Sequence, residues 1–186
     1  INGKKILSDN EGNIIILGDV ENDITGFDIT TLKYDNQGNL LWNRAYTENF
    51  GAGDYSVDLC LDQENNIYSL GRTFSNFNTG VDYITIKYKP SGETSWFRKY
   101  NGFENGTEYP TSIAVDKNKN VFVTGASQGV NGDYDWVTIK YSQNSIGMQQ
   151  ISNLVPNAFK LEQNYPNPFN PETIIRFHIP GYLRML

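Results

Sequence analysis

The chain has 186 residues, of which 38% are hydrophobic and 13% aromatic, and this composition excludes a disordered acidic chain. Its net charge of −6 and its scattered 15 Lys and Arg residues argue against nucleic acid or an anionic membrane as partner, because both need clustered positive charge. No run of the sequence approaches the roughly 20 apolar residues of a membrane helix, so no membrane span is expected.

One pattern occurs three times along the chain. Its first anchor is an apolar run that ends in glycine, and the glycines Gly18, Gly71 and Gly125 are 71 − 18 = 53 and 125 − 71 = 54 residues apart. A second anchor, which reads Asp, two residues, Thr, one residue, Lys and Tyr, recurs in the same phase at residues 28–34, 82–88 and 135–141. The period therefore belongs to whole supersecondary units, and the chain is a tandem array.

Each unit is predicted to contain four short strands. In the second unit, Val57, Leu59 and Leu61 alternate with more polar residues, as a half-buried strand requires. Tight turns separate the predicted strands, and the strands themselves are rich in β-branched and aromatic residues. The strands of this unit are expected at residues 56–62, 67–71, 82–88 and 94–100. Four antiparallel strands per unit predict a β-propeller blade.

Other repeat architectures fit the sequence less well. Helical solenoids need apolar stripes of period 3.6, and a leucine-rich repeat needs about half this period. A blade buries both faces against its neighbours, so a ring of about four to eight blades is the usual arrangement. We therefore predict an all-β chain of about three four-stranded blades in an incomplete ring, followed by the start of a small β-sandwich. The expected blades cover approximately residues 4–46, 56–100 and 111–148.

The third unit differs from the others at its end. After Tyr141, the strand that carries tryptophan in the first two units is replaced by residues 142–148, so this blade is expected to lack its outer strand. The chain opens at Ile1, almost directly inside a repeat, which favours a fragment with the missing strand upstream. The alternative is that the chain oligomerises into a ring or remains an arc with exposed edges.

The repeats resemble a known family. The pattern of a strand ending in Asp116, a strand ending in Thr-Gly125, and the anchor at residues 135–141 resembles the seven-bladed β-propeller repeat family of bacterial secreted proteins. This resemblance covers roughly residues 4 to 141 and implies the propeller fold. It does not imply one activity, because propellers carry many unrelated functions.

The tail changes character after about residue 150. Residues 154–180 resemble the opening of the C-terminal sorting domain of the type IX secretion system, found on proteins of Bacteroidetes and related phyla. The resemblance implies export through the outer membrane, by contact with the secretion machinery, to the medium or the cell surface. We therefore divide the chain into an array at 1–149 and a truncated sorting domain at 150–186, with a first strand at 174–179. The sorting motif comprises Asn164, Tyr165, Pro166, Asn167, Pro168, Phe169, Asn170 and Pro171.

Catalytic chemistry has few candidate residues. His178 is the only histidine and lies in the tail, so the blades cannot assemble a Ser-His-Asp triad or a multi-histidine metal site. Cys60 is the only cysteine and lies on an apolar strand, where an inert buried thiol is expected. We predict no catalytic residues and no cofactor, which leaves carboxylates as the one possible catalytic route.

The acidic turns are weak calcium candidates. Asp9, Asp62 and Asp116 each open a turn rich in Asp, Asn and Glu, and a similar turn starts at Asp35. A twelve-residue calcium loop from Asp9 would need a bidentate glutamate at position 20, which is Val20. Asp and Asn also satisfy the backbone of hairpin turns, so we interpret these residues as structural.

The other recurring residues are also interpreted as scaffold, because a functional site is normally made once per ring. Strand parity places the anchor aspartates and lysines on opposite faces, from which they could bridge neighbouring blades. Trp42 and Trp96 recur 54 residues apart and are expected to pack in the core or between blades. The residue that corresponds to Trp136 is Ile29 in the first unit and Tyr83 in the second, so the repeat does not require tryptophan at this position.

These observations predict a non-catalytic, secreted or surface-displayed module that binds a protein or glycan or acts as a scaffold. One alternative is part of a propeller enzyme, for example a polysaccharide-active one, whose site lies in missing blades. Another is a spacer between an upstream catalytic domain and the cell surface.

Overall fold

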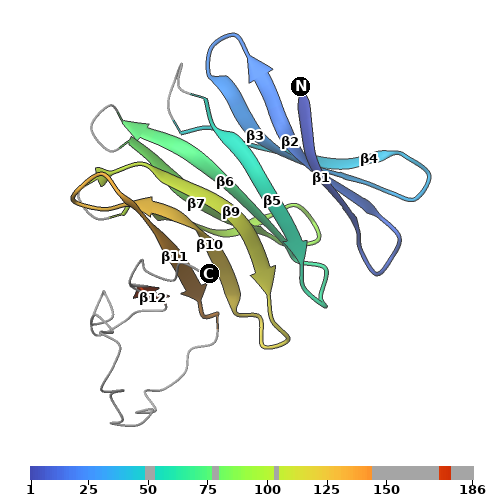
Figure 1. Ribbon diagram of the computed structural model, residues 1–186. Coiled ribbons are helices and arrows are strands. Elements are labelled where there is room, and N and C mark those ends of the chain that lie inside the picture. The colour runs from blue at the N-terminus through green and yellow to red at the C-terminus, as the bar shows by residue number, and fades with distance from the viewer. Residues whose placement is uncertain (49–52, 77–79, 103–104, 144–171, 177–186) are drawn as a thin grey trace, which may run out of the picture.

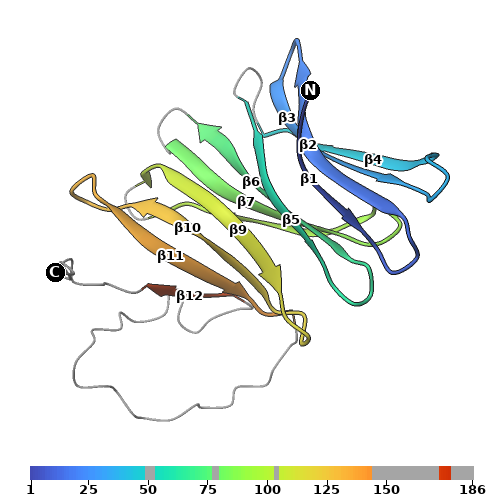
Figure 2. The same cartoon turned by 45° about the vertical axis from the view of Figure 1, so that its right-hand side comes forward.

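The computed structural model describes residues 1–48, 53–76, 80–102, 105–143 and 172–176. In these residues it contains strands and no α-helix, and it has no helix long and apolar enough to cross a membrane. Three four-stranded antiparallel sheets stack side by side, with the second sheet in the middle (Figures 1 and 2). The predicted all-β fold of four-stranded blades is confirmed.

The strands of each sheet follow one another in chain order. The first sheet contains β1 (Asn2–Ser8), β2 (Ile14–Asn22), β3 (Gly26–Tyr34) and β4 (Leu40–Tyr46). The second contains β5 (Tyr55–Leu61), β6 (Ile67–Asn76), β7 (Gly80–Tyr88) and β8 (Thr94–Tyr100). The third contains β9 (Glu108–Val115), β10 (Val121–Gln128), β11 (Tyr134–Tyr141) and β12 (Glu172–Arg176). The first strands of the sheets, β1, β5 and β9, lie next to one another.

The fourth strand of the third sheet comes from the tail. β12 pairs antiparallel with β11, in the register Val137 with Arg176, and occupies the edge that β4 and β8 occupy in the other sheets. The sequence predicted a strand at 174–179 that opens a separate sandwich, whereas the observed strand is Glu172–Arg176 and completes a blade. An unpaired edge offers a row of backbone hydrogen-bonding groups, and a β-branched segment of the same chain satisfies them.

Two apolar cores separate the sheets. The core between the first and second sheets includes Ile15 and Leu17 from β2 and Ile84 and Ile86 from β7. The core between the second and third sheets includes Tyr68 and Leu70 from β6, and it also contains buried residues of β10, such as Val123, and of β11, such as Val137. The second sheet therefore buries both of its faces, which is why most of β7 is buried at successive positions. This arrangement confirms that neighbouring units shield one another's apolar faces.

The repeated glycines lie at positions that have no room for a Cβ. A Cβ on Gly71 would overlap Cδ1 of Ile29 in the first sheet and would lie 2.7 Å from the carbonyl oxygen of Tyr55. A Cβ on Gly125 would likewise overlap the hydroxyl of Tyr83 in the second sheet. At Gly18, Gly71 and Gly125 alike, a Cβ would also crowd a carbonyl oxygen of the adjacent strand in the same sheet, from Asn2, Tyr55 and Tyr109 respectively. The glycine therefore recurs because the neighbouring backbone leaves no room for a side chain.

Candidate functional site

The acidic turns share one geometry. In the turn between β1 and β2, Oδ1 of Asp9 accepts the backbone N–H groups of Glu11 and Asn13, both at 2.9 Å, and Oδ2 accepts the side-chain amide of Asn13 at 2.9 Å. The same three bonds recur in the turns that begin at Asp35, Asp62 and Asp116. In each turn the carboxylate closes the hairpin that joins two adjacent strands, as Asx-type turns do.

Two of these carboxylates have a further partner. Oδ2 of Asp9 also binds Nζ of Lys33 at 2.9 Å, and both side chains are buried. Oδ2 of Asp62 accepts the hydroxyl of Tyr68 at 2.9 Å. Burial alone would raise both carboxyl pKa values, but these hydrogen bonds outweigh it and hold the pKa of Asp9 and Asp62 below the ordinary value. The two groups are therefore held ionised by the scaffold itself.

The calcium prediction can be tested directly. Within the part of the chain that the structure describes, no group of three or more His, Cys, Asp or Glu side chains gathers into a metal site. The oxygens of Asp9, Asp62 and Asp116 already accept hydrogen bonds from their own turns. We expect the melting temperature to be the same with excess calcium and with chelator, measured by differential scanning calorimetry. A calcium-dependent increase that Asp62→Asn abolishes would contradict this expectation.

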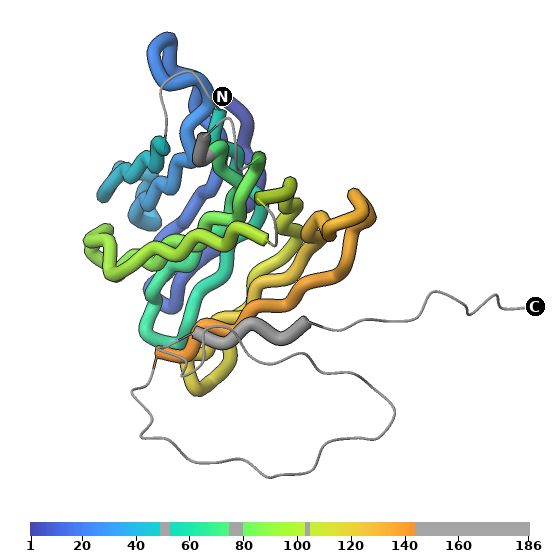
Figure 3. The backbone as a smooth tube through the Cα atoms, turned by 90° about the vertical axis from the view of Figure 1, so that its left-hand side faces the viewer, coloured from blue at the N-terminus to red at the C-terminus, as the bar shows by residue number. Residues whose placement is uncertain are grey.

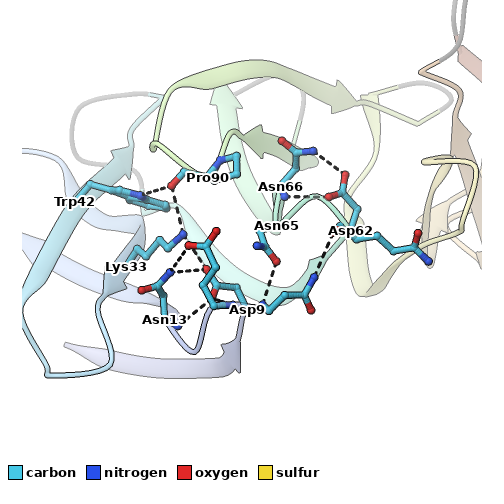
Figure 4. A network of polar contacts seen from close by, with 11 residues as sticks. Asp9, Asn13, Lys33, Trp42, Asp62, Asn65, Asn66 and Pro90 are labelled. Atoms are coloured by element: carbon cyan, nitrogen blue, oxygen red, sulfur yellow. Dashed lines mark hydrogen bonds and ion pairs between the residues drawn. The ribbon is translucent and has the colours of Figure 1, made fainter.

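The turns also connect neighbouring sheets (Figure 4). Asn10 donates its backbone N–H to Oδ1 of Asn65 at 3.1 Å and its side-chain amide to the carbonyl of Gln63 at 3.2 Å, which joins the first turn to the second. Nζ of Lys119 lies 2.5 Å from Oε1 of Glu64, which joins the third sheet to the second. These links lie at the same end of the three sheets, so the turns fix how the sheets stack.

The repeated lysines lie between sheets. Lys33 pairs with Asp9 of its own sheet and also reaches the carbonyl oxygen of Pro90 in the second sheet, at 3.4 Å. Lys87 donates to Oε1 of Gln143 beyond β11, and its ammonium lies 5.2 Å from the ring centroid of Tyr68. Both lysines therefore bridge adjacent blades, as strand parity predicted.

Loss of the Lys33 charge should weaken the fold. Lys33→Met leaves the buried Asp9 carboxylate without its cation, and breaking a buried pair costs up to about 5 kcal/mol. We expect a smaller loss of about 2 kcal/mol in the free energy of unfolding, because the Asn13 and Glu11 donors remain. Urea denaturation of Lys33→Met, of Asp9→Asn and of the double variant measures the coupling energy between the two side chains.

The same variant should show a pH signature. The folded-state pKa of Asp9 lies below the ordinary value of 3.8, so its stabilisation is complete above that value and is lost as pH falls through the lower folded value. The difference between the unchanged chain and Lys33→Met should therefore shrink as the pH drops below 3.8. A difference that is equal at neutral and at acidic pH would contradict this assignment.

Cys60 lies in β5 and packs against the core between the second and third sheets. Burial, with smaller contributions from the Asp58 and Asp62 charges, raises the pKa of its thiol to about 12. Because the thiolate is the reactive form, we expect an aromatic disulfide reagent to label Cys60 slowly in the native protein and rapidly in urea. Rapid labelling of the native protein would contradict this expectation.

A second set of buried carboxylates lies between the sheets, and the sequence reasoning missed it. Asp54 accepts the hydroxyl of Thr73 and, at 2.9 Å, the backbone N–H of Glu48. Glu108 accepts the hydroxyl of Ser127 at 3.3 Å. The two pairs are equivalent, since 108 − 54 and 127 − 73 both equal 54, and that spacing is the signal that could have found them.

Asp54 differs chemically from the turn carboxylates. Burial, followed by the nearby charges of Glu48 and Asp28, raises its carboxyl pKa above the ordinary value. A carboxyl with a raised pKa has one property of a general acid. Its repetition at both joins between sheets, as Asp54 and again as Glu108, is the pattern of a structural element and not of a site made once.

Large exposed side chains gather on the outer face of the third sheet. Tyr109 from β9 and Tyr134 from β11 place their ring centroids 5.6 Å apart, and Trp136 of β11 is 78% exposed. We call these three residues the outer aromatic face. β9 and β11 belong to the third sheet, and the second sheet lies between them and the first sheet (Figure 3). Neither Tyr109 nor Tyr134 was predicted as a site residue.

The predicted sorting motif cannot be placed. Its residues lie outside the part of the chain that the structure describes, as does His178. These are Asn164, Tyr165, Pro166, Asn167, Pro168, Phe169, Asn170 and Pro171. The division of the chain at residue 150 therefore stays a prediction.

Known proteins match the array. The family described as SBBP, Beta-propeller repeat, matches residues 96–133, which run from β8 to the end of the turn before β11. An uncharacterized WD repeat-containing protein of Acanthamoeba polyphaga mimivirus is 24% identical over 216 aligned residues, which cover 88% of this chain but 15% of the viral protein. The chain thus spans about a seventh of that relative.

A solved structure also aligns with the array. It is a fucose lectin from Kordia zhangzhouensis in complex with methyl-fucoside, and it is 14% identical with a TM-score of 0.41, covering 75% of this chain and 92% of the lectin. The family match and the three stacked four-stranded sheets agree on the nature of the repeating unit. This chain contains a β-propeller repeat module.

Proposed function

We propose that the chain is a non-catalytic binding or scaffold module of a protein exported by type IX secretion. One observation supports this most strongly: the array uses its buried charged and polar groups in contacts that recur from blade to blade. The Asp9 and Asp62 turns have the same hydrogen bonds, and Asp54 and Glu108 occupy equivalent positions between sheets. Repeated contacts of this kind make a rigid platform, and rigid platforms that carry loops are suited to recognition.

The ligand of such a module is proposed to be a protein or a glycan. We expect the purified chain, immobilised on a biosensor surface, to bind one or more members of a panel of polysaccharides and glycoproteins. The same incubations should release no reducing ends, because binding is expected without turnover.

The competing proposal is a propeller enzyme in which Asp54 and Glu108 take part. It draws support from the raised carboxyl pKa of Asp54. It predicts release of reducing ends that Asp54→Asn or Glu108→Gln abolishes while the variants stay folded by circular dichroism. That result would overturn the non-catalytic proposal.

Export is proposed from the tail, at residues 150–186, by contact with the type IX machinery. A reporter protein fused to this tail, in a bacterium with that machinery, should reach the medium or the cell surface. Replacement of Pro166, Pro168 and Pro171 by alanine removes the fixed backbone angles of the motif and should reduce export. A reporter that stays inside the outer membrane with the intact tail would refute this part of the proposal.

A further inference from the structure

We infer that Arg72 anchors the carboxylate of an acidic sugar at the join between the second and third sheets. The inference deepens the proposed function and rests on it, because it names the class of glycan that the module binds and one residue that binds it. It starts from a repeat position at which the two joins within the chain are closed by different groups.

The position after the repeated glycine differs in every unit. It holds Asp19 in the first unit, Arg72 in the second and Ala126 in the third. These places are equivalent, since 72 − 19 = 53 and 126 − 72 = 54. Residues that serve every blade recur in every blade, as the aspartates of the turns do. A position that changes from an acid to a base to a methyl group does not belong to that repeated scaffold.

At the join between the first and second sheets, this position completes the hydrogen bonding of the backbone. Asp19 is buried, and its Oδ1 accepts the backbone N–H of Ser56 in the second sheet at 2.6 Å. The hydroxyl of Ser56 donates in turn to the carbonyl oxygen of Gly18 at 2.8 Å. The fold itself therefore uses the acid at this join.

The join between the second and third sheets lacks both halves of that contact. The counterpart of Ser56 is Pro110, since 110 − 56 = 54, and proline has neither a backbone N–H nor a hydroxyl. An acid would have no such donor there, and Arg72 stands in its place. Its guanidinium lies against two tyrosine rings, with Cζ 5.0 Å from the centroid of Tyr55 in β5 and 6.0 Å from that of Tyr109 in β9.

The nitrogen atoms of Arg72 are available to a ligand. The side chain is half-buried, and among the described residues no oxygen accepts a hydrogen bond from its guanidinium and no carboxylate pairs with it. None of its nitrogens is both buried and without a partner, so the unpaired donors are open to solvent. A guanidinium holds its N–H donors in a planar fork, and contact with aromatic rings restricts the plane of that fork. Arg72 is therefore a cation that the fold orients and does not neutralise.

The chemistry of this fork selects a single negative charge. A guanidinium binds a carboxylate through two parallel hydrogen bonds. Phosphate carries more charge, and its sites commonly use several cations or the N-terminus of a helix. Arg72 is one cation in a chain of net charge −6, and the described residues form no α-helix that could assist it. A carboxylate is therefore the group that fits.

A sugar acid fits this place better than an acidic peptide does. Acidic peptide motifs are recognised by clusters of arginines, and peptide C-termini by groups of backbone N–H donors. Here one arginine lies against two phenol rings, and Pro110 on the adjacent strand has no N–H to offer. The rings of Tyr55 and Tyr109 provide apolar surface together with hydroxyl groups, which suits the C–H groups and hydroxyls of a sugar ring.

The test is the binding of trigalacturonate, trimannuronate and sialyllactose to the full 186-residue chain, measured by isothermal titration calorimetry. We expect at least one of these acids to bind, and its methyl ester, which keeps the sugar and removes the charge, to bind at least about tenfold more weakly. Arg72→Met keeps the stem of the side chain and removes its donors, so it should cause a loss of similar size. Arg72→Lys keeps the charge without the fork, so its affinity should lie between those of the methionine variant and the unchanged chain.

The matched control is Arg44→Met. Arg44 also lies near an aromatic ring, with Cζ 5.9 Å from the centroid of Trp42, but it donates to the carbonyl oxygens of Gly92 and Asn43, each at 2.6 Å. Its donors are used by the fold, so this variant should bind the sugar acids as the unchanged chain does. Circular dichroism checks that both methionine variants are folded at the temperature of the titration.

The inference is overturned if Arg72→Met binds as tightly as the unchanged chain, if acid and methyl ester bind equally, or if Arg44→Met loses as much affinity as Arg72→Met. It is also overturned if a triglutamate peptide binds where no sugar acid does. A chain that binds other members of the polysaccharide and glycoprotein panel but none of these acids refutes the inference and leaves the proposed function in place. A chain that binds no member of the panel and none of the acids refutes both.

Discussion

Gly125→Ala should destabilise the third sheet and its packing against the second sheet. The new Cβ would overlap the carbonyl oxygen of Tyr109 and the hydroxyl of Tyr83, and it would lie 2.8 Å from Cα of Pro110. Two of these three obstacles are backbone atoms, which cannot move aside as a flexible side chain can. Overpacking of this kind costs about 3 kcal/mol or more when the backbone must shift. Urea denaturation followed by circular dichroism measures the loss.

The matched control is Gly129→Ala, in the turn that follows β10. A Cβ there would lie 3.6 Å from the carbonyl oxygen of Asp133, which is an ordinary van der Waals contact. We expect this variant to stay within about 0.5 kcal/mol of the unchanged chain. Equal stability of the two alanine variants would mean that the close approach of β9 and Tyr83 does not require glycine at position 125.

Trp42→Ala should have a comparable or larger effect. Trp42 of β4 is buried, its ring centroid lies 6.0 Å from that of Tyr88 in the second sheet, and its Nε1 donates to the carbonyl of Pro90 at 3.0 Å. Truncation removes both the packing and the hydrogen bond between the first two sheets. Loss of a buried tryptophan costs about 3–5 kcal/mol, so the midpoint of urea unfolding should fall sharply.

Two further variants separate the contributions at this join. Trp42→Phe keeps a ring against Tyr88 but loses the Nε1 donor, and should cost about 1–2 kcal/mol. Leu41→Ala changes the adjacent, half-exposed residue of β4 and should cost less than about 1 kcal/mol. A Trp42→Ala loss no greater than that of Leu41→Ala would show that the tryptophan does not hold the sheets together.

Much of the fold could be predicted because local and repeated signals agree. The alternation in residues 56–62 and the dense β-branched run in residues 82–88 each fix a strand, and their recurrence fixes a four-stranded unit. The roles of Lys33 and Trp42 at a join followed from strand parity and from recurrence. Residues that serve every blade recur in every blade, so repetition by itself reveals them.

The candidate site was less predictable because its residues owe their chemistry to burial. Asp54 and Glu108 look like ordinary loop-proximal acids in sequence, and only packing between two sheets buries them and raises the pKa of Asp54. The pairing of β12 with β11 was missed for a related reason. β12 pairs with the unpaired backbone groups of β11, which lie about thirty residues earlier in the chain. No local pattern in the sequence shows which distant segment will pair with such an edge.

The sequence by itself determined the period, the strands and the glycine of each unit, because backbone conformation and hydrophobic alternation are local properties. Only the tertiary structure decided which faces meet, since Tyr83 is buried and Trp136 is exposed at the same repeat position, and among the described residues another sheet packs only on Tyr83. The physical reason is that burial belongs to the contact between two units and not to either unit alone.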